Sequence, residues 1–455
     1  MLRLGIAESI KKLIELGRIK EAEEALRGSI AEAVRYDPEY AERLLIELER
    51  LNRLRREYSL DVKEAFRKFR SEFPGAAEDE FRRLLSKGSF DCRIIDGELK
   101  FFRNFAFNFA KLHKEWWSRR REDDRLREAR SALYARQDEV VQLGGREGGY
   151  VAPLKIKVLH KVSLKPGALP PGEKVKVWIP VPRRYELHPS VKILNASHKY
   201  YLSGEDHPQR TIYFEGVTND KGAANFWVEY EYTVYGYYLN VDLSEVVEYD
   251  IDDSLYLTYT SKKPPHISFT PYLENLAREI VGSERNPYLK VERIFKWIIK
   301  HVTYNLSYDY VLYDNIPEFI AKEKRGDCGM QALLFITLCR IAGIPARWQS
   351  GWYMNPLKPG MHDWAQFYIE PYGWLYVDPS FGGSMPLERK HFYLGNIEGF
   401  RMAANSDIAV QFDPPKRHFR SDPVDSQRGE LEWKYGNLYY DSWDYELKVL
   451  SYERL

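Results

Sequence analysis

Three residues of the types that cooperate in nucleophilic catalysis lie between positions 328 and 378. Cys328 opens an apolar run, His362 follows a Pro-Gly loop in PGMHDWAQFYIEP, and Asp378 ends the stretch GWLYVD. A thiolate can attack a carbonyl, an imidazole can carry the proton, and a carboxylate can hold the imidazole in one tautomer. This pattern predicts cysteine-dependent acyl transfer, with Cys328 as nucleophile, His362 as base and Asp378 as the group that orients the base.

The element that must position the thiol is a helix that starts at Cys328. Apolar residues continue from Gly329 to Ala342, Gly343 supplies a C-terminal cap, and Ile344-Pro345 follows. The start of a helix offers free N–H groups and a positive dipole end, which lower the pKa of a thiol placed there. The dipole contributes only of order 1 kcal/mol, so a base is needed as well.

Strands are expected after this helix in ARWQSGWYM, DWAQFYIEP and GWLYVDP. On adjacent antiparallel strands His362 and Asp378 can lie side by side. Two other aspartates compete for the orienting role. Asp327 is expected to cap the helix or to be exposed, and Asp363 should face away from the base, because neighbouring residues of a strand point to opposite faces.

The spacing at which apolar residues recur divides the chain into four parts. Helical spacing predicts an all-α region over 1–143, and GGREGG over 144–149 predicts a flexible break. Alternation with period two predicts a β-sandwich over 150–245. Residues 246–412 mix helices and strands and are expected to form the catalytic domain. Residues 413–455 are expected to form a strand-rich extension of that domain.

The composition limits the classes of function and partner. Lys plus Arg (68) and Asp plus Glu (67) nearly cancel, which argues against nucleic acid or an anionic membrane as partner. The three cysteines lack metal-ligand spacing, so Cys92 and Cys339 are expected to be structural, and we expect no disulfide, no metal and no cofactor. No apolar run has the length of a signal peptide or membrane span, which makes cytoplasmic the expected location.

The motifs around the three candidate residues also carry a family resemblance. RGDCGMQALLFITLCRIAGIPARWQSGW together with HDWAQFYIEPYGWLYVDPSFG closely resembles the transglutaminase-like superfamily of papain-like enzymes. The resemblance covers about 265–412 and, loosely, the sandwich. It implies an α+β fold, in which a papain-like transglutaminase core (helix plus antiparallel sheet) follows a β-sandwich and an all-α N-terminal region. It implies the roles given above for Cys328, His362 and Asp378.

Three aromatic residues are secondary candidates. Eukaryotic members of the superfamily add an upstream tryptophan that stabilises the oxyanion, and Tyr304 in HVTYNLSYDY is the candidate for that place. A tyrosine in the core is an equally good interpretation of this residue. Trp352 and Trp364 could line a substrate groove, although packing within the sheet is the stronger interpretation for both.

The resemblance leaves the acyl acceptor open. Hydrolysis of a peptide or side-chain amide through a Cys328 thioester is the favoured reaction, which would make the protein a cysteine protease or amidase. Crosslinking of glutamine by an amine needs the same three residues and is the alternative acyltransferase reaction. A non-catalytic protein that binds peptide or glycan is a third hypothesis. The expected partner is a protein or peptide substrate, and the sequence names no partner for the helical N-terminal region.

Overall fold

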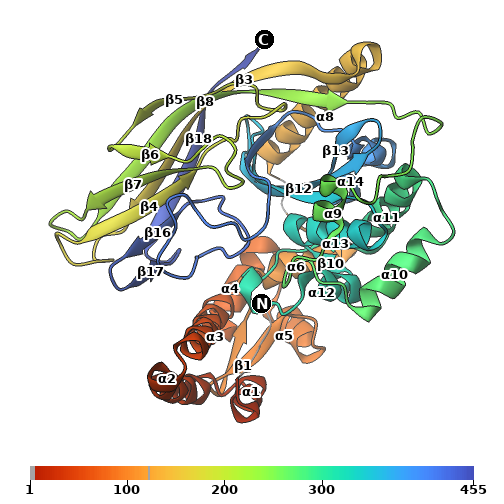
Figure 1. Ribbon diagram of the computed structural model, residues 1–455. Helices are drawn as coiled ribbons and strands as arrows, with labels where there is room; N and C mark the ends of the chain where they lie inside the picture. Colours follow the sequence, from red (N-terminus) through yellow and green to blue (C-terminus); the bar gives the residue numbers. More distant parts are fainter. Residues whose placement is uncertain (1–5, 121–122) are drawn as a thin grey trace.

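The computed structural model describes residues 6–120 and 123–455. Figure 1 shows a helical N-terminal region, a β-sandwich built from two separate stretches of the chain, and a mixed region that the chain forms between those two stretches. The expected α+β class is confirmed. Among the described residues, none of the helices combines the length and the apolarity that a membrane crossing requires.

The N-terminal region is a set of short helices with one small hairpin. Asp37 accepts a hydrogen bond from Tyr40 N and precedes Pro38 at the first helical position, and Asp61 forms a capping box with Glu64. The elements are α1 (Glu8–Glu15), α2 (Ile19–Tyr36), α3 (Pro38–Glu57), α4 (Val62–Glu72), α5 (Glu78–Ser86), β1 (Cys92–Ile95), β2 (Glu98–Phe101), α6 (Phe105–Leu112) and α7 (Lys114–Ser118). The β1–β2 hairpin departs from the all-α prediction.

The last helix of the predicted N-terminal region belongs to another part of the fold. Helix α8 (Asp124–Glu147) continues through Gly144 and Gly145, and the chain turns only at Gly148 and Gly149, where φ is +70° and +74°. It packs on the long strands of the sandwich, where Arg136 donates to the carbonyl oxygens of Ala152 and Glu398. The predicted boundary at 143 therefore cuts a helix.

Two antiparallel sheets form the sandwich, and their strands alternate buried and partly exposed residues as the period predicts. The first half of the sandwich comprises β3 (Gly149–Leu164), β4 (Lys174–Pro180), β5 (Val191–Ala196), β6 (Tyr200–Leu202), β7 (Thr211–Val217) and β8 (Ala224–Tyr238). One sheet has the order β18-β3-β8-β5 and the other β17-β16-β4-β7-β6. The sandwich is thus completed by the last three strands of the chain.

The assignment of 413–455 to the catalytic domain is wrong. Strands β16 (Glu430–Trp433) and β17 (Gly436–Leu438) extend the sheet of β4, and β18 (Trp443–Arg454) pairs along nearly the whole of β3. None of the three pairs with the catalytic sheet. Long-range strand pairing decides this placement, and the composition of a segment does not predict which distant strand it pairs with. Residues 239–429 are consequently inserted between β8 and β16; the stretch 239–412 is called the inserted region, and 413–455 the C-terminal segment.

The inserted region places one buried helix against a five-stranded antiparallel sheet. Its helices are α9 (Ser254–Thr260), α10 (Pro271–Val281), α11 (Pro287–His301), α12 (Ile316–Glu323), α13 (Cys328–Ile341) and α14 (Pro379–Ser384), with short 3-10 turns at Tyr310–Leu312 and Leu387–Tyr393. Its strands are β9 (Thr303–Tyr304), β10 (Arg325–Gly326), β11 (Ala346–Tyr353), β12 (Gly360–Ile369), β13 (Gly373–Val377), β14 (Leu394–Gly395) and β15 (Arg401–Asn405). The sheet order is β14-β13-β12-β11-β15. Helix α13 is buried from Gly329 to Arg340 and packs on β11 and β12.

Candidate active site

Cys328 is the first residue of α13, where the sequence placed it. Asp327 caps the helix by accepting from Met330 N at 3.0 Å, so the capping prediction is confirmed. Its carboxylate also accepts from the hydroxyls of Ser307 and Tyr310, and the residue is partly buried rather than exposed. Cys339, on the same helix, is fully buried in the core.

The thiol is in contact with a carboxylate. Cys328 Sγ donates to Asp363 Oδ2 at 3.6 Å, within the range of a sulfur hydrogen bond. Burial, and then the negative charges of Asp363 and Asp327, raise the pKa of the Cys328 thiol well above its usual value. The helix start does not overcome these effects, so the expected lowering of the thiol pKa is wrong for the free protein.

The expected pairing of His362 and Asp378 is present. His362 Nε2 is 2.6 Å from Asp378 Oδ2, which also accepts from Arg401 Nη1 at 2.8 Å. Burial raises the pKa of Asp378, but the charges of His362 and Arg401 outweigh it and hold this pKa well below its usual range. The Phe381 ring stacks on the imidazole at 4.5 Å between centroids. Asp378 is therefore an ionised carboxylate that fixes one orientation of the imidazole.

No hydrogen bond joins Cys328 to His362, both of which the structure describes. His362 and Asp363 are successive residues of β12 and point to opposite sides of the strand, as expected. The thiol donates its hydrogen bond to the side chain of Asp363. The prediction that set Asp363 aside as a residue facing elsewhere therefore missed its contact with the nucleophile.

Cys328 lines a cavity of about 520 Å³. All three regions supply its walls. They are represented by Arg53 and Arg103 from the N-terminal region, Tyr304 and Cys328 from the inserted region, and Gln427 and Tyr440 from the C-terminal segment. The size is that of a small-ligand or single side-chain site. Neither His362 nor Asp378 lines it.

The three aromatic candidates occupy different places. Tyr304 lines the cavity with its hydroxyl unbonded to any described residue, and burial raises its pKa, so the hydroxyl keeps its proton. Trp352 is buried and donates from Nε1 to Gln427 O at 2.7 Å. Trp364 is fully buried and stacks beside His362 with centroids 6.2 Å apart. Neither tryptophan lines the cavity, which corrects their candidacy for a substrate groove and confirms packing within the sheet.

Two sets of cavity residues escaped the sequence analysis. Asp422, Asp425 and Gln427 come from a segment that sequence position alone could not bring to Cys328. Arg53 and Glu57 come from α3, more than 250 residues before the thiol. The dense polar run SDPVDSQRGE, next to aromatic strands, was the one available signal of a functional segment. Within residues 6–120 and 123–455, no cluster of three or more His, Cys, Asp or Glu side chains could hold a metal ion.

Comparison with known proteins agrees with this geometry. Residues 274–379 match the family model of the transglutaminase-like superfamily. This stretch contains Cys328, His362 and Asp378, so the chain carries a domain of that superfamily, as its motifs predict.

Individual relatives are distant. An uncharacterized protein of Haemophilus influenzae is 25% identical over 227 residues, and the match covers 40% of this chain and 60% of that relative. A crystal structure described as a "Putative Cysteine Protease from Cytophaga hutchinsonii" has 20% identity and a TM-score of 0.43, covering 66% of this chain and 92% of that one. The periplasmic domain of TgpA from Pseudomonas aeruginosa has 16% identity and a TM-score of 0.27, covering 56% and 95%.

Proposed function

We propose that the protein is a cysteine-dependent acyl-transfer enzyme that hydrolyses an amide bond of a protein or peptide. The observation that carries the proposal is the position of Cys328, which starts a buried helix and lines a cavity. The hydrogen-bonded His362–Asp378 pair in the same domain is its natural acid–base partner.

In this proposal Cys328 Sγ attacks the amide carbonyl and forms a thioester. The backbone N–H of Cys328 and the Tyr304 hydroxyl are candidate donors to the oxyanion, and Tyr304 has no other described partner for its proton. His362, oriented by Asp378, protonates the leaving amine and then activates the water that resolves the thioester. The stacked rings of Phe381 and Trp364 hold the imidazole in place during both transfers.

The test compares the wild type, Cys328→Ala and Cys92→Ala on a peptide library, with and without a primary amine, by mass spectrometry. We expect cleavage or deamidation by the wild type and by Cys92→Ala, whose half-buried thiol lies in the N-terminal hairpin. Cys328→Ala should lose the reaction by several orders of magnitude. Cleavage that survives in Cys328→Ala would refute the proposal, and incorporation of the amine would identify a crosslinking acyltransferase instead.

The remaining attributes stay predictions from composition. These are a cytoplasmic location and the absence of nucleic acid and membrane as partners. The N-terminal helices contribute arginine and glutamate side chains to the cavity, so we propose that they take part in substrate selection.

A further inference from the structure

Asp363 is held against the thiol from two directions. Its Oδ2 accepts from Cys328 Sγ at 3.6 Å, and its Oδ1 accepts from Gln427 Nε2 at 2.6 Å. Gly329 makes the approach possible, because a Cβ at this position would lie 2.6 Å from Asp363 Oδ2. Both carboxylate oxygens are thus positioned, and a further side-chain hydrogen bond joins Asp363 to Asp425.

The surroundings of Asp363 favour a base of unusually high proton affinity. Burial, and then the charges of Asp425, Asp327 and Asp422, raise its pKa well above its usual value. Arg420 acts on Asp422 and Asp425, but none of the four carboxyls has a lysine, arginine or histidine nitrogen within 4.0 Å in the described parts of the chain. The titratable groups that face this site are Cys328, Asp327, Tyr304 and Tyr310 from the inserted region and Asp422 and Asp425 from the C-terminal segment.

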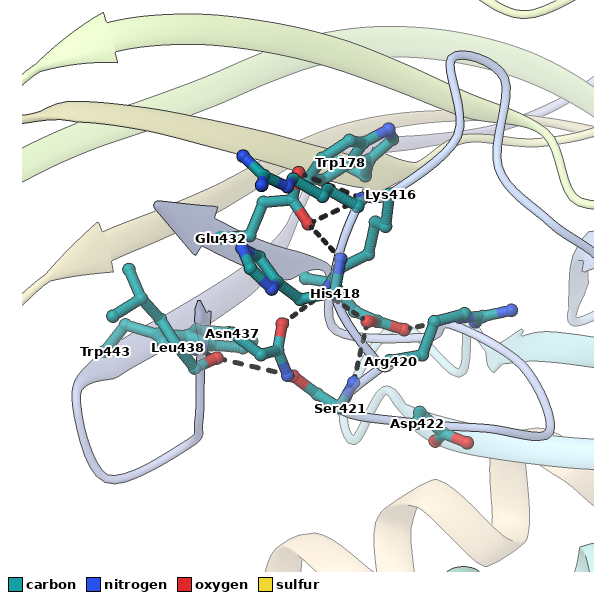
Figure 2. Close-up of polar contacts among 12 residues, drawn as sticks. Trp178, Lys416, His418, Arg420, Ser421, Asp422, Glu432, Asn437, Leu438 and Trp443 are labelled. Carbon is teal, nitrogen blue, oxygen red and sulfur yellow. Dashed lines mark hydrogen bonds and ion pairs between the residues drawn. The ribbon is translucent and has the colours of Figure 1, made fainter. Parts of the chain in front are cut away.

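The C-terminal segment that supplies Gln427 is anchored by buried charges. Lys416 Nζ and Arg420 Nε both donate to Glu430, at 2.8 and 2.9 Å, and Ser421 N donates to the same carboxylate at 2.8 Å. Figure 2 shows Lys416, Arg420 and Ser421 of this segment, with Asp422 directly after Ser421. The anchor lies on β16 of the sandwich, so the sandwich fixes the position of the residues that clamp Asp363.

We propose that Asp363 is a further catalytic residue, whose carboxylate accepts the proton of the Cys328 thiol while the His362–Asp378 pair serves the leaving amine. This inference rests on the proposed acyl-transfer function and divides its two proton transfers between two groups. The geometry supports it directly, because the thiol donates to Asp363 and has no hydrogen bond to His362.

Protons and electron pairs balance over one catalytic cycle of amide hydrolysis. The thiol proton moves to Asp363 Oδ2 as Sγ bonds to the carbonyl carbon, and the carbonyl π pair moves to oxygen. When the oxyanion collapses, the C–N bond breaks and the amine takes a proton from the His362 imidazolium. Water then adds to the thioester and gives its proton to His362. The thiolate leaves and recovers its proton from Asp363, which restores the starting state.

The test measures the alkylation rate of Cys328 by iodoacetamide between pH 5 and 10, with the modified peptide quantified by mass spectrometry. A thiol and a carboxylate that share one proton titrate as a pair, so the wild-type rate should be level between their two apparent pKa values. In Asp363→Asn the acceptor is gone, and the rate should rise about tenfold for each pH unit up to the pKa of the thiol.

Two variants serve as matched controls. Asp422→Asn removes a carboxyl that lines the same cavity without touching the sulfur, so its profile should shift but keep the level region. His362→Gln should also keep the level region. A level region that persists in Asp363→Asn, or that only His362→Gln loses, would overturn the proposal.

Chemical rescue keeps the inference testable if the asparagine variant folds poorly. In Asp363→Ala, added formate should restore the level region and formamide should not, because only formate can accept the proton; failure of formate to restore it counts against the proposal. Alkylation requires no amide substrate, so its outcome is separate from that of the proposed function. Amide hydrolysis that persists in Cys328→Ala would remove the function without altering the alkylation profiles.

Discussion

At the residue scale, the candidate nucleophile is stored as a neutral thiol. Burial and neighbouring carboxylates raise the pKa of Cys328, whereas His362 is paired with an ionised aspartate, Asp378. A neutral thiol resists oxidation and unwanted alkylation, because the thiolate is the reactive form. In the proposed step the thiol passes its proton to Asp363 as Sγ attacks the acyl carbon.

Gly329 is the residue on which the contact between Cys328 and Asp363 depends. We expect Gly329→Ala to destabilise the protein by about 1–3 kcal/mol, because the new methyl group meets Asp363 and the Tyr310 hydroxyl in a packed site. Chemical denaturation measures this change. The pH profile of Cys328 alkylation should change in the same variant, because Asp363 must move.

Gly145→Ala is the matched control for this substitution. Gly145 lies within α8 with open space around its missing Cβ, so alanine should leave the free energy of unfolding unchanged or raise it by up to about 1 kcal/mol. Equal changes in the free energy of unfolding in the two variants would contradict the close packing of Gly329 against Asp363 and Tyr310.

At the element scale, a buried helix and an anchored segment meet at the cavity. Helix α13 is buried around its whole circumference because both the sheet and the surrounding helices cover it, and this makes its first turn a rigid support. The segment from Lys416 to Arg428 has no helix or strand of its own, and takes its shape from Glu430 and Glu432 on β16. One wall of the site is therefore rigid and the other depends on ion pairs.

Removing the anchoring charge tests that dependence. Glu430→Gln leaves Lys416 and Arg420 buried without their carboxylate, so we expect a loss of about 3–5 kcal/mol in the free energy of unfolding. Amide hydrogen exchange over 416–428 should rise with it. Glu173→Gln breaks a partly exposed pair with Lys434 and should lower the free energy of unfolding far less than Glu430→Gln does. Similar losses in the two variants would argue against the ion-pair anchor.

The elements that could be predicted from sequence are those whose signals are local. The start of α13, its glycine cap and the strands after it follow from periodicity, turn residues and motif spacing. The three C-terminal strands were recognisable as strands, but their partners were not, because β18 pairs with β3 across almost 300 positions. The same limit hid Gln427 and Asp425, which reach Cys328 only after that pairing has formed.

At the scale of the whole molecule, the cavity is a junction of three regions. Arg53 of α3 donates to Asp309 in the inserted region at 2.8 Å and to Arg420 O in the C-terminal segment at 2.9 Å. One buried guanidinium thus joins all three walls. The N-terminal helices, whose purpose the sequence did not indicate, are part of the site for this reason.

A pH dependence of stability follows from His160, which links the sandwich to the segment over the cavity. Its Nε2 donates to Arg428 O at 3.1 Å, and complete burial lowers its pKa to about 4. The unfolded chain binds a proton near pH 6.5 and the folded protein does not, so stability is full above that pH and falls as the pH drops toward 4. The loss should reach about 3 kcal/mol at pH 4.

Denaturant titrations at several pH values check this expectation. His160→Gln should be less stable than the wild type near pH 7 and should lack the part of the slope between pH 6.5 and 4 that His160 contributes. An unchanged slope in this variant would mean that other groups produce the acid sensitivity.

The insertion of the catalytic region between β8 and β16 has a consequence for synthesis. Cys328, His362 and Asp378 leave the ribosome before β16, β17 and β18, which complete the sandwich and anchor the last wall of the cavity. Domains generally fold in the order in which they are made. During translation the thiol therefore exists for a time in a half-built site without Gln427. The growing chain would carry the Cys328 thiol before Gln427 can position Asp363 against it. This order of synthesis would keep the nascent protein from reacting with neighbouring proteins.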